Sequence, residues 1–209
     1  PETVADVEIR AALAAVEDGA DPAFEARLGA YLALLERSGG VFNLVASTDR
    51  AELVTRHLAD AAAALPWLAE RRRAPVVDLG SGAGLPGLVL ACLDPDRDYR
   101  LVDARGSKTR FLRQAVVELG LRHVEVVAAR IEDLEPTDAL LLARALAPLP
   151  RLAALTEQSL AAGAELLAWK GPGVHAELAG LADHFGAEVI RSYTLPGRES
   201  EHHLVRLRR

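Results

Sequence analysis

The sequence predicts an α/β protein built on a mostly parallel sheet of seven strands, with a helical extension before it. Seven short apolar runs follow residue 74, and each is long enough for a buried strand. Amphipathic segments of helical spacing separate most of these runs, and crossover helices of this kind join parallel strands. The first 65 residues instead carry apolar side chains at helical spacing, which predicts the extension.

The N-terminal region is expected to form two helices. The first should start at Asp21-Pro22 and end at Ser38-Gly39-Gly40, because proline suits a first helical turn and glycine suits a helix end. Ser47-Thr48-Asp49 offers caps for a second helix at about 50–65, where Glu52 would complete a capping box. Two helices in a row predict a segment that packs on the sheet rather than joining it.

The core is expected to begin near residue 71. We divide the chain into a helical extension at 1–70 and a core at 71–209, packed together as one structural domain. The predicted strands lie at 75–79, 99–103, 123–128, 139–143, 165–170, 187–194 and 203–208, and the predicted helices at 86–93, 107–119, 150–161 and 174–185. No helix separates the last two strands, so at least one antiparallel pair should close the sheet.

Composition narrows the class of protein. One cysteine, Cys92, cannot form a disulfide framework or a cysteine-rich zinc site, and we expect no metal. No apolar run reaches the roughly 20 residues that span a bilayer, and the acidic N-terminus is unlike a signal peptide, so we expect a cytoplasmic protein without membrane spans. The net charge of −6 argues against general coating of nucleic acid but leaves room for a local basic face on RNA.

The strongest local signal is a glycine-rich segment, Val77-Asp78-Leu79-Gly80-Ser81-Gly82-Ala83-Gly84-Leu85-Pro86-Gly87. It follows a predicted strand and opens a predicted helix, which is the context in which glycine spacing indicates a cofactor-binding turn. Glycines permit a tight turn and a close approach of backbone to ligand. Asp103 ends the next strand, 21 residues after Gly82. Its carboxylate can accept hydrogen bonds from both ribose hydroxyls of an adenosine.

Two cofactors fit these residues. Residues 82–87 match Gly-x-Gly-x-x-Gly, so a nicotinamide dinucleotide and an oxidoreductase activity stay open. Asp78, at the head of the loop, is unfavourable beside a pyrophosphate but favourable beside the ammonium and sulfonium of S-adenosylmethionine. The sign of that charge favours S-adenosylmethionine and methyl transfer. Asp78 can also cap the loop by accepting backbone N–H groups, and the two roles are compatible.

With other segments, the glycine-rich stretch resembles the RsmG (glucose-inhibited division protein B) family, which methylates guanine N7 in small-subunit ribosomal RNA. The likeness runs from about residue 30 to 205. The Leu85-Pro86-Gly87 ending of the loop and the segment Phe111-Leu112-Arg113-Gln114 are specific in combination. The other matching pieces are Phe42-Asn43-Leu44, Arg56-His57-Leu58-Ala59-Asp60, Lys108-Thr109-Arg110, Arg130-Ile131-Glu132, Ala143-Arg144-Ala145, Lys170-Gly171 and His203-Leu204-Val205.

The resemblance implies a Rossmann-like class I methyltransferase core, S-adenosylmethionine as cofactor and 16S ribosomal RNA as partner. It implies cofactor contacts from Gly80, Leu85, Ile131, Glu132 and Arg144. The loop and its neighbouring strand add Asp78, Gly82 and Asp103 as expected cofactor residues. We expect a monomer. Val45, Ala61 and His202 differ from the family's usual residues, which leaves open a non-catalytic RNA-binding or ribosome-assembly factor that keeps the fold.

Methylation of guanine N7 needs alignment and charge control from the protein, because N7 already carries an in-plane lone pair. Arg144 ends the fourth predicted strand at the edge where open α/β sheets bind ligands, so we expect it in the catalytic pocket. A salt bridge at the strand rim is the alternative. Lys170 ends the fifth strand and is expected either near RNA phosphate or in solvent. His57 and Asp60 lie three apart on a predicted helix and are expected to form a structural pair.

Overall fold

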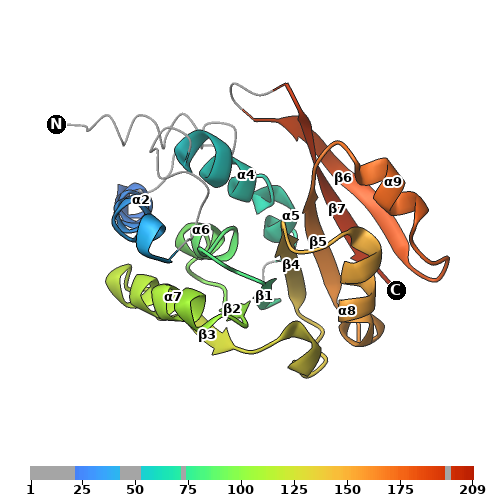
Figure 1. Ribbon diagram of the computed structural model, residues 1–209, viewed down its shortest axis with the longest axis horizontal. Coiled ribbons are helices and arrows are strands. Elements are labelled where there is room, and N and C mark those ends of the chain that lie inside the picture. The colour runs from blue at the N-terminus through green and yellow to red at the C-terminus, as the bar shows by residue number, and fades with distance from the viewer. Residues whose placement is uncertain (1–21, 43–52, 72–73, 196–198) are drawn as a thin grey trace.

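The computed structural model describes residues 22–42, 53–71, 74–195 and 199–209, and within them seven strands form one sheet (Figure 1). The strands are β1 (Val76–Leu79), β2 (Tyr99–Asp103), β3 (Val124–Ala128), β4 (Leu140–Arg144), β5 (Glu165–Lys170), β6 (Gly186–Thr194) and β7 (Glu201–Arg208). Their order in the sheet is β3-β2-β1-β4-β5-β7-β6. The first five strands in this order, β3, β2, β1, β4 and β5, are parallel to one another. β7 is antiparallel to both of its neighbours, β5 and β6. The predicted mostly parallel sheet and its closing antiparallel pair are therefore confirmed.

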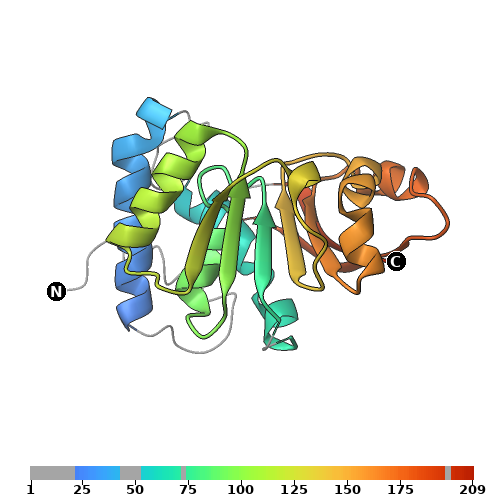
Figure 2. The same cartoon turned by 90° about the horizontal axis from the view of Figure 1, so that it is seen from below.

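Helices cover both faces of this sheet (Figures 1 and 2). They are α2 (Pro22–Phe42), the π-helix η1 (Leu53–Leu58), α4 (Ala59–Ala62), α5 (Leu65–Ala69), α6 (Gly87–Leu93), α7 (Gly106–Glu118), the 3-10 helix η2 (Ile131–Asp133), α8 (Leu149–Ala161) and α9 (Val174–Ala179). α2, α4, α5, α6 and α7 share one buried apolar cluster on one face of the sheet. α8 shares a second cluster on the opposite face with the first residue of α9, Val174.

Alternation along β1 directs its side chains to the two faces. Val76 belongs to the cluster beneath α6 and α7, whereas Val77 and Leu79 belong to the cluster beneath α8. Side chains alternate along a strand, so Asp78 points to the α6 face. Leu79 pairs with Val102 of β2 on one side and with Ala143 of β4 on the other. The next residue on each strand therefore reaches the same carboxyl edge of the sheet.

Three predicted helix boundaries are wrong. α2 continues through Gly39-Gly40 to Phe42, because a glycine lowers helix stability by only about 1 kcal/mol and does not forbid a helix. Within the segment expected as one helix at 50–65, residues 53–62 form the π-helical η1 followed by the short α4, and residues 63 and 64 form a turn. Apolar spacing alone does not distinguish a π-helix, with its i→i+5 hydrogen bonds, from an α-helix. The expected caps at 47–49 and the capping-box residue Glu52 lie outside the described residues. α9 ends at Ala179 rather than near 185, because the weak helix former Gly180 follows it.

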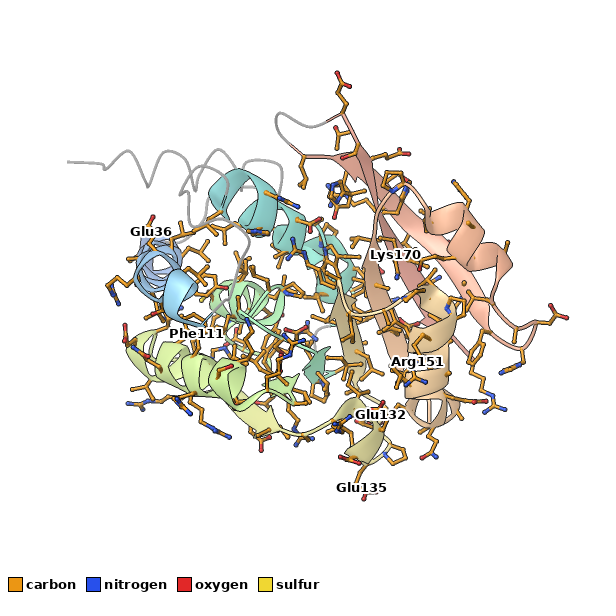
Figure 3. The ribbon with its side chains drawn as sticks, in the orientation of Figure 1. Glu36, Phe111, Glu132, Glu135, Arg151 and Lys170 are labelled. Carbon is orange, nitrogen blue, oxygen red and sulfur yellow. The ribbon has the colours of Figure 1, made fainter. Side chains whose placement is uncertain are left out.

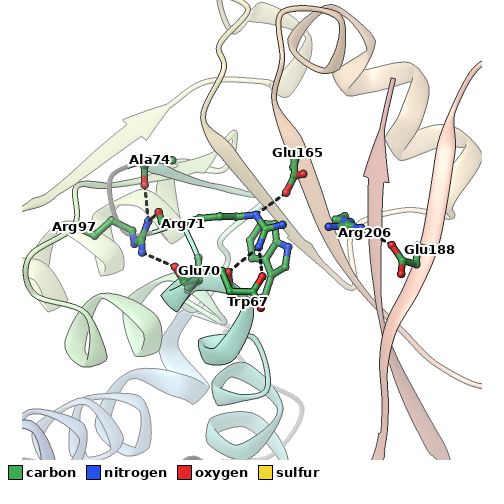
Figure 4. Close-up of polar contacts among 9 residues, drawn as sticks. Trp67, Glu70, Arg71, Ala74, Arg97, Glu165, Glu188 and Arg206 are labelled. Carbon is green, nitrogen blue, oxygen red and sulfur yellow. Dashed lines mark hydrogen bonds and ion pairs between the residues drawn. The ribbon is translucent and has the colours of Figure 1, made fainter.

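Arg97 fixes the end of the helical extension to the core. Its side chain is buried, and it donates hydrogen bonds at 2.6–2.9 Å to three carbonyl oxygens, those of Leu68, Arg71 and Ala74 (Figure 4). It also pairs with Asp94 at 2.7 Å. Carbonyls at a helix end otherwise lack intrahelical partners. Arg71 lies over the ring of Trp67 and pairs with Glu165 of β5 at 2.7 Å, so the same segment is also held against the sheet (Figure 4).

Candidate active site

The turn after β1 depends on glycine as the sequence predicted. Three of its residues adopt φ between 56° and 93°, a region that side chains disfavour: Gly80, Gly82 and Gly84. The Ser81 amide donates to the Val102 carbonyl oxygen at 2.9 Å, which holds the turn on β2. The Tyr31 hydroxyl of α2 donates to the Ala83 carbonyl oxygen at 2.8 Å. The helical extension therefore supports the loop directly.

Asp78 lies beneath the loop. Its side chain is buried, and Oδ2 accepts a hydrogen bond at 3.1 Å from the Gly87 amide at the start of α6. Burial raises the pKa of Asp78 to about 7, and the Gly87 hydrogen bond opposes that rise. Oδ1 is buried without a hydrogen-bond partner among the described residues. These contacts give Asp78 the loop-capping role, and its expected contact with the cofactor stays a prediction.

Asp103 joins the end of β2 to the same loop. Its Oδ2 accepts a hydrogen bond from the Gly82 amide at 2.9 Å, and its Oδ1 accepts one from the Arg105 amide at 2.8 Å. The two bonds fix the carboxylate beside the glycine turn. Each carboxylate oxygen has a second lone pair, so the group can still accept a hydrogen bond from a ligand.

A cavity of about 650 Å³ opens where the carboxyl ends of β1, β2 and β4 meet. Seven of the eight residues expected to bind a cofactor line it: Gly80, Gly82, Leu85, Asp103, Ile131, Glu132 and Arg144. Asp78 is the eighth and does not line it. The volume is in the range of small-molecule sites, and open α/β sheets bind their ligands at this edge. A second hollow, of about 450 Å³, lies at the amino ends of the strands and includes no part of the glycine loop.

Charged residues that the sequence analysis did not assign to the site also line the cavity. Lys108 is 7% exposed, and burial followed by the neighbouring Arg105 lowers its pKa. Arg105 and Arg130 add positive charge to the same wall. Glu132 pairs with Arg151 of α8 at 3.3 Å, and Figure 3 shows these two side chains near each other. Lys108 is the third residue of α7, the helix that follows Asp103, and this position is a signal that could have placed it at the cavity.

Arg144 lies at the cavity and in an ion pair at the same time. Its Nε is 2.6 Å from Oδ2 of Asp60, which is buried in α4, and its Nη2 is 3.0 Å from Nδ1 of His57. His57 lines the cavity with it. Arg144 therefore forms the salt bridge and also lines the cavity, and its expected catalytic role stays a prediction. His57 and Asp60 meet through this guanidinium, which the sequence spacing could not show because Arg144 lies 84 residues after Asp60.

Lys170 is not a solvated strand end, and its expected approach to RNA phosphate stays a prediction. Its side chain is 8% exposed, and Nζ donates to the Ala147 carbonyl oxygen at 2.6 Å and pairs with Glu177 at 2.8 Å. Glu177 also accepts a hydrogen bond from the Leu149 amide at 2.7 Å. Together these contacts hold the loop from β4 to α8. That loop contributes to the cavity wall through Ala145, whose φ of 52° is unusual for a residue with a side chain.

Other features of the described residues bear on membranes, metals and thiol chemistry. No described helix is long and apolar enough to cross a membrane. No three or more His, Cys, Asp or Glu side chains among the described residues are grouped so that they could hold a metal ion. Burial raises the pKa of Cys92 to about 12, so its thiol packs as a small apolar group. Of the three departures from the resembled family, Ala61 is buried, His202 lies 3.6 Å from Asp60, and Val45 lies outside the described residues.

Comparison with solved structures shows a shared fold at low sequence identity. The crystal structure of magnesium protoporphyrin IX methyltransferase from Synechocystis with bound S-adenosylmethionine matches with a TM-score of 0.55 at 13% identity, over 100% of this chain and 93% of that one. An rRNA methylase from Streptococcus thermophilus matches with a TM-score of 0.51 at 18% identity, over 71% of this chain and 95% of that one. These likenesses show the Rossmann-like methyltransferase fold.

Comparison with sequences identifies the family. The family model described as rRNA small subunit methyltransferase G matches residues 25–205. The ribosomal RNA small subunit methyltransferase G of Chromohalobacter salexigens is 41% identical over 206 residues, which cover 98% of this chain and 97% of the relative. The protein of the same name from Halorhodospira halophila is 45% identical over 179 residues, 84% and 82% of the two chains. The resemblance inferred from the motifs is confirmed, and the chain belongs to the rRNA small subunit methyltransferase G family.

Proposed function

We propose that this chain is an S-adenosylmethionine-dependent methyltransferase that acts on guanine N7 of 16S ribosomal RNA. The observation that carries the proposal is the cavity at the carboxyl edge of the sheet. There the glycine loop, Asp103 and Arg144 converge in a chain of this family. Cytoplasmic location and a monomeric state stay predictions that accompany this function.

The residues at the cavity fit the proposed cofactor. Asp103 can accept hydrogen bonds from ribose hydroxyls, and Gly80 and Gly82 allow a ligand to lie against the backbone because they have no Cβ. Ile131 offers an apolar surface for an adenine ring, with Glu132 beside it. When bound, S-adenosylmethionine would supply a methyl group activated by a sulfonium.

A nicotinamide dinucleotide fits this loop less well. A pyrophosphate binds at a helix N-terminus through backbone amides that have no other partner. At the start of α6, the Gly87 amide already donates to the carboxyl group of Asp78. Above about pH 7, where Asp78 loses its proton, a pyrophosphate at this position would also lie close to a like charge. A cofactor without phosphate avoids both conflicts, so the contacts support S-adenosylmethionine.

The chemistry proposed for the protein is alignment and control of charge. Guanine N7 is a hydrogen-bond acceptor with its lone pair in the ring plane, so no residue has to remove a proton. Holding the reacting groups in line can lower a barrier by roughly 7–11 kcal/mol in the best cases. Arg144 only donates hydrogen bonds. It therefore suits an acceptor such as a cofactor carboxylate or guanine O6, rather than the N7 that becomes cationic.

The test is transfer of a labelled methyl group to defined RNA. The purified chain would be incubated with labelled S-adenosylmethionine and small ribosomal subunits, or their RNA, from a strain that lacks the modification. Mass spectrometry of the digested RNA should find 7-methylguanosine at one position. Absence of label from the RNA, or label on another atom, would contradict the proposal. Tight RNA binding without transfer would favour the non-catalytic alternative.

A matched pair of carboxylate variants makes the test specific to the cavity. Asp103→Ala should lower transfer about tenfold or more, because a hydrogen bond to a charged group contributes about 1.5–3 kcal/mol. Asp98→Ala removes an exposed carboxylate just before β2, the strand that Asp103 ends, and should leave methyl transfer unchanged. Equal activity of the two variants would exclude Asp103 from the site.

A further inference from the structure

Asp60 is a buried charged residue that the proposed chemistry does not use. It is 3% exposed, and its carboxylate has contacts on both oxygens. Oδ2 pairs with Nε of Arg144 at 2.6 Å, and Oδ1 accepts a hydrogen bond from the Tyr193 hydroxyl. Nδ1 of His202 lies 3.6 Å from Oδ1, and the Asp60 carbonyl oxygen accepts a hydrogen bond from Nε1 of Trp169 at 2.8 Å. Five elements, α4, β4, β5, β6 and β7, therefore meet at this one residue.

Cohesion of the fold does not require such a cluster. A buried ion pair loses about as much free energy by desolvation as it gains by attraction, and packed apolar side chains of similar size are often as stable. Fully satisfied polar networks do, however, fix the orientation of their members. The arrangement around Asp60 therefore indicates a role in orienting the charged partner, Arg144.

The contacts of Arg144 show which part of it is held. A guanidinium only donates hydrogen bonds, so Nδ1 of His57 must accept from Nη2 and carries no proton there. Asp60 holds Nε on the same side. Among the described residues, Nη1 makes no hydrogen bond, and Arg144 lines the cavity. The two held nitrogens thus leave Nη1 as the donor that can serve a ligand.

Tyr193 completes the arrangement from the far side. Burial, followed by the charge of Asp60, raises the pKa of Tyr193, so its hydroxyl stays protonated and donates to the carboxylate. Tyr193 lies on β6, in register with His202 of β7. The antiparallel end of the sheet is thereby connected to the carboxyl edge where the cavity lies.

We infer that Asp60 is a positioning residue for Arg144 and that Tyr193 positions Asp60, so that the guanidinium presents Nη1 to the cavity. This inference rests on the proposed function, in which Arg144 contacts the cofactor or the target base. Asp60 and Tyr193 touch neither. They act through the orientation of Arg144 alone.

A double-mutant cycle tests the inference on the full chain. Asp60→Asn keeps the shape but removes the charge and one acceptor, and should lower kcat/KM for methyl transfer to the RNA about tenfold, as expected for coupled residues. The same substitution in an Arg144→Ala background should change kcat/KM by less than about twofold. Equal fold losses in both backgrounds would overturn the inference, because a residue that only stabilises the fold acts independently of Arg144.

Tyr193→Phe keeps the test decisive if Asp60→Asn does not fold. It should lower kcat/KM in the same direction by a smaller factor, and again only when Arg144 is present. Tyr99→Phe is the matched control, since it removes a buried hydroxyl near the opposite, amino edge of the sheet and should leave kcat/KM unchanged. Loss of activity on Tyr193→Phe that persists without Arg144 would overturn the inference.

A measurement that needs no activity separates this inference from the proposed function. In proton–nitrogen NMR spectra of arginine-labelled protein, the Nε–H resonance that is lost in Arg144→Ala should shift on Asp60→Asn and stay in place on Tyr99→Phe. A wild-type chain that transfers no methyl group contradicts the proposed function. The NMR result tests the positioning role whether or not methyl transfer is seen. An Arg144 resonance that is unchanged by Asp60→Asn would overturn that role.

Discussion

Gly87 begins α6 at a point where the helix presses against β1 and β2. A Cβ at this position would lie 2.5 Å from Oδ2 of Asp78 and 2.5 Å from Cδ2 of Leu101. Neither neighbour can move easily, because Asp78 caps the loop and Leu101 is part of the core. The last glycine of the motif is therefore required by close packing between helix and sheet, separately from any ligand.

The substitution Gly87→Ala tests this close approach. Alanine normally stabilises a helix relative to glycine, but here we expect a loss of about 1–3 kcal/mol in the free energy of unfolding because the site is overpacked. Gly106→Ala at the start of α7 is the control, since a Cβ there meets nothing within 4 Å. Urea denaturation measures both. Equal effects of the two substitutions would contradict the packing account.

Asp78 should make stability depend on pH. Its pKa rises from the usual 3.8 to about 7 in the folded chain because of burial. Between about pH 4 and pH 7 the folded state therefore holds a proton that the unfolded state releases. The stabilisation is complete below the unfolded pKa and is lost as pH rises through the folded one.

The comparison with Asp78→Asn isolates this effect, because asparagine does not titrate and can still accept from the Gly87 amide. The free energy of unfolding of the native chain, relative to the variant, should fall by on the order of 4 kcal/mol across that window, at about 1.4 kcal/mol per pKa unit. Denaturant titrations at several pH values measure it. A difference that stays flat, or that grows with pH, would show that Asp78 is ionised in the folded chain.

Individual site residues were predictable from the sequence to different degrees. Asp103 and the loop glycines could be predicted because they follow the ends of two consecutive strands, and the spacing between these ends can be read directly from the sequence. The capping of Gly87 by Asp78 was one of two compatible roles, and only the fold shows that Asp78 does not line the cavity. The pairing of Asp60 with Arg144 could not be predicted from spacing, since it depends on how α4 packs on β4.

At the scale of elements, the junction between the helical extension and the core depends on one arginine. Arg97 closes the end of α5 by donating to three carbonyl oxygens while it pairs with Asp94 (Figure 4). Among the described residues, the Ala74 carbonyl oxygen has no other donor, whereas the Leu68 and Arg71 oxygens also accept the amides of Arg71 and Ala74. An apolar side chain would therefore leave the Ala74 oxygen unsatisfied, and an unsatisfied buried group costs about 1–3 kcal/mol.

Arg97→Met should therefore lower the free energy of unfolding by roughly 2–4 kcal/mol, because the Ala74 carbonyl oxygen loses its donor and the partly exposed Asp94 loses its ion-pair partner. Arg100→Ala breaks the exposed pair between β2 and Glu125 and should cost at most about 1 kcal/mol. Chemical denaturation of both variants provides the measurement. A loss of similar size from the two would mean that Arg97 contributes no more than a surface charge.

Element types were more predictable than element boundaries. Strands β1 to β5 and helices α6 to α8 followed from apolar runs and spacing, because each packs on the sheet through one continuous pattern. The π-helical form of η1 and the end of α9 did not follow, although a helix beginning at residue 174 was predicted. Their limits depend on contacts with other elements and on one glycine, rather than on the periodicity of their own side chains.

At the scale of the molecule, the helical extension takes part in the site that the sheet creates. Tyr31 of α2 bonds the glycine loop, and His57 and Asp60 bond Arg144 from η1 and α4. The site thus combines elements on both sides of the boundary drawn at residue 71. The sequence predicts an extension that packs on the core but does not indicate that it completes the cavity, because contacts between distant segments have no signature in local spacing.

Binding of S-adenosylmethionine at the carboxyl edge is the claim on which the rest depends, and titration calorimetry on the full chain tests it most directly. The account predicts one site with a dissociation constant on the order of micromolar, weakened about tenfold or more by Asp103→Ala and unchanged by Asp98→Ala. It predicts no comparable binding of a nicotinamide dinucleotide. Absence of binding by the wild-type chain, or equal affinity in the Asp103→Ala variant, would contradict it.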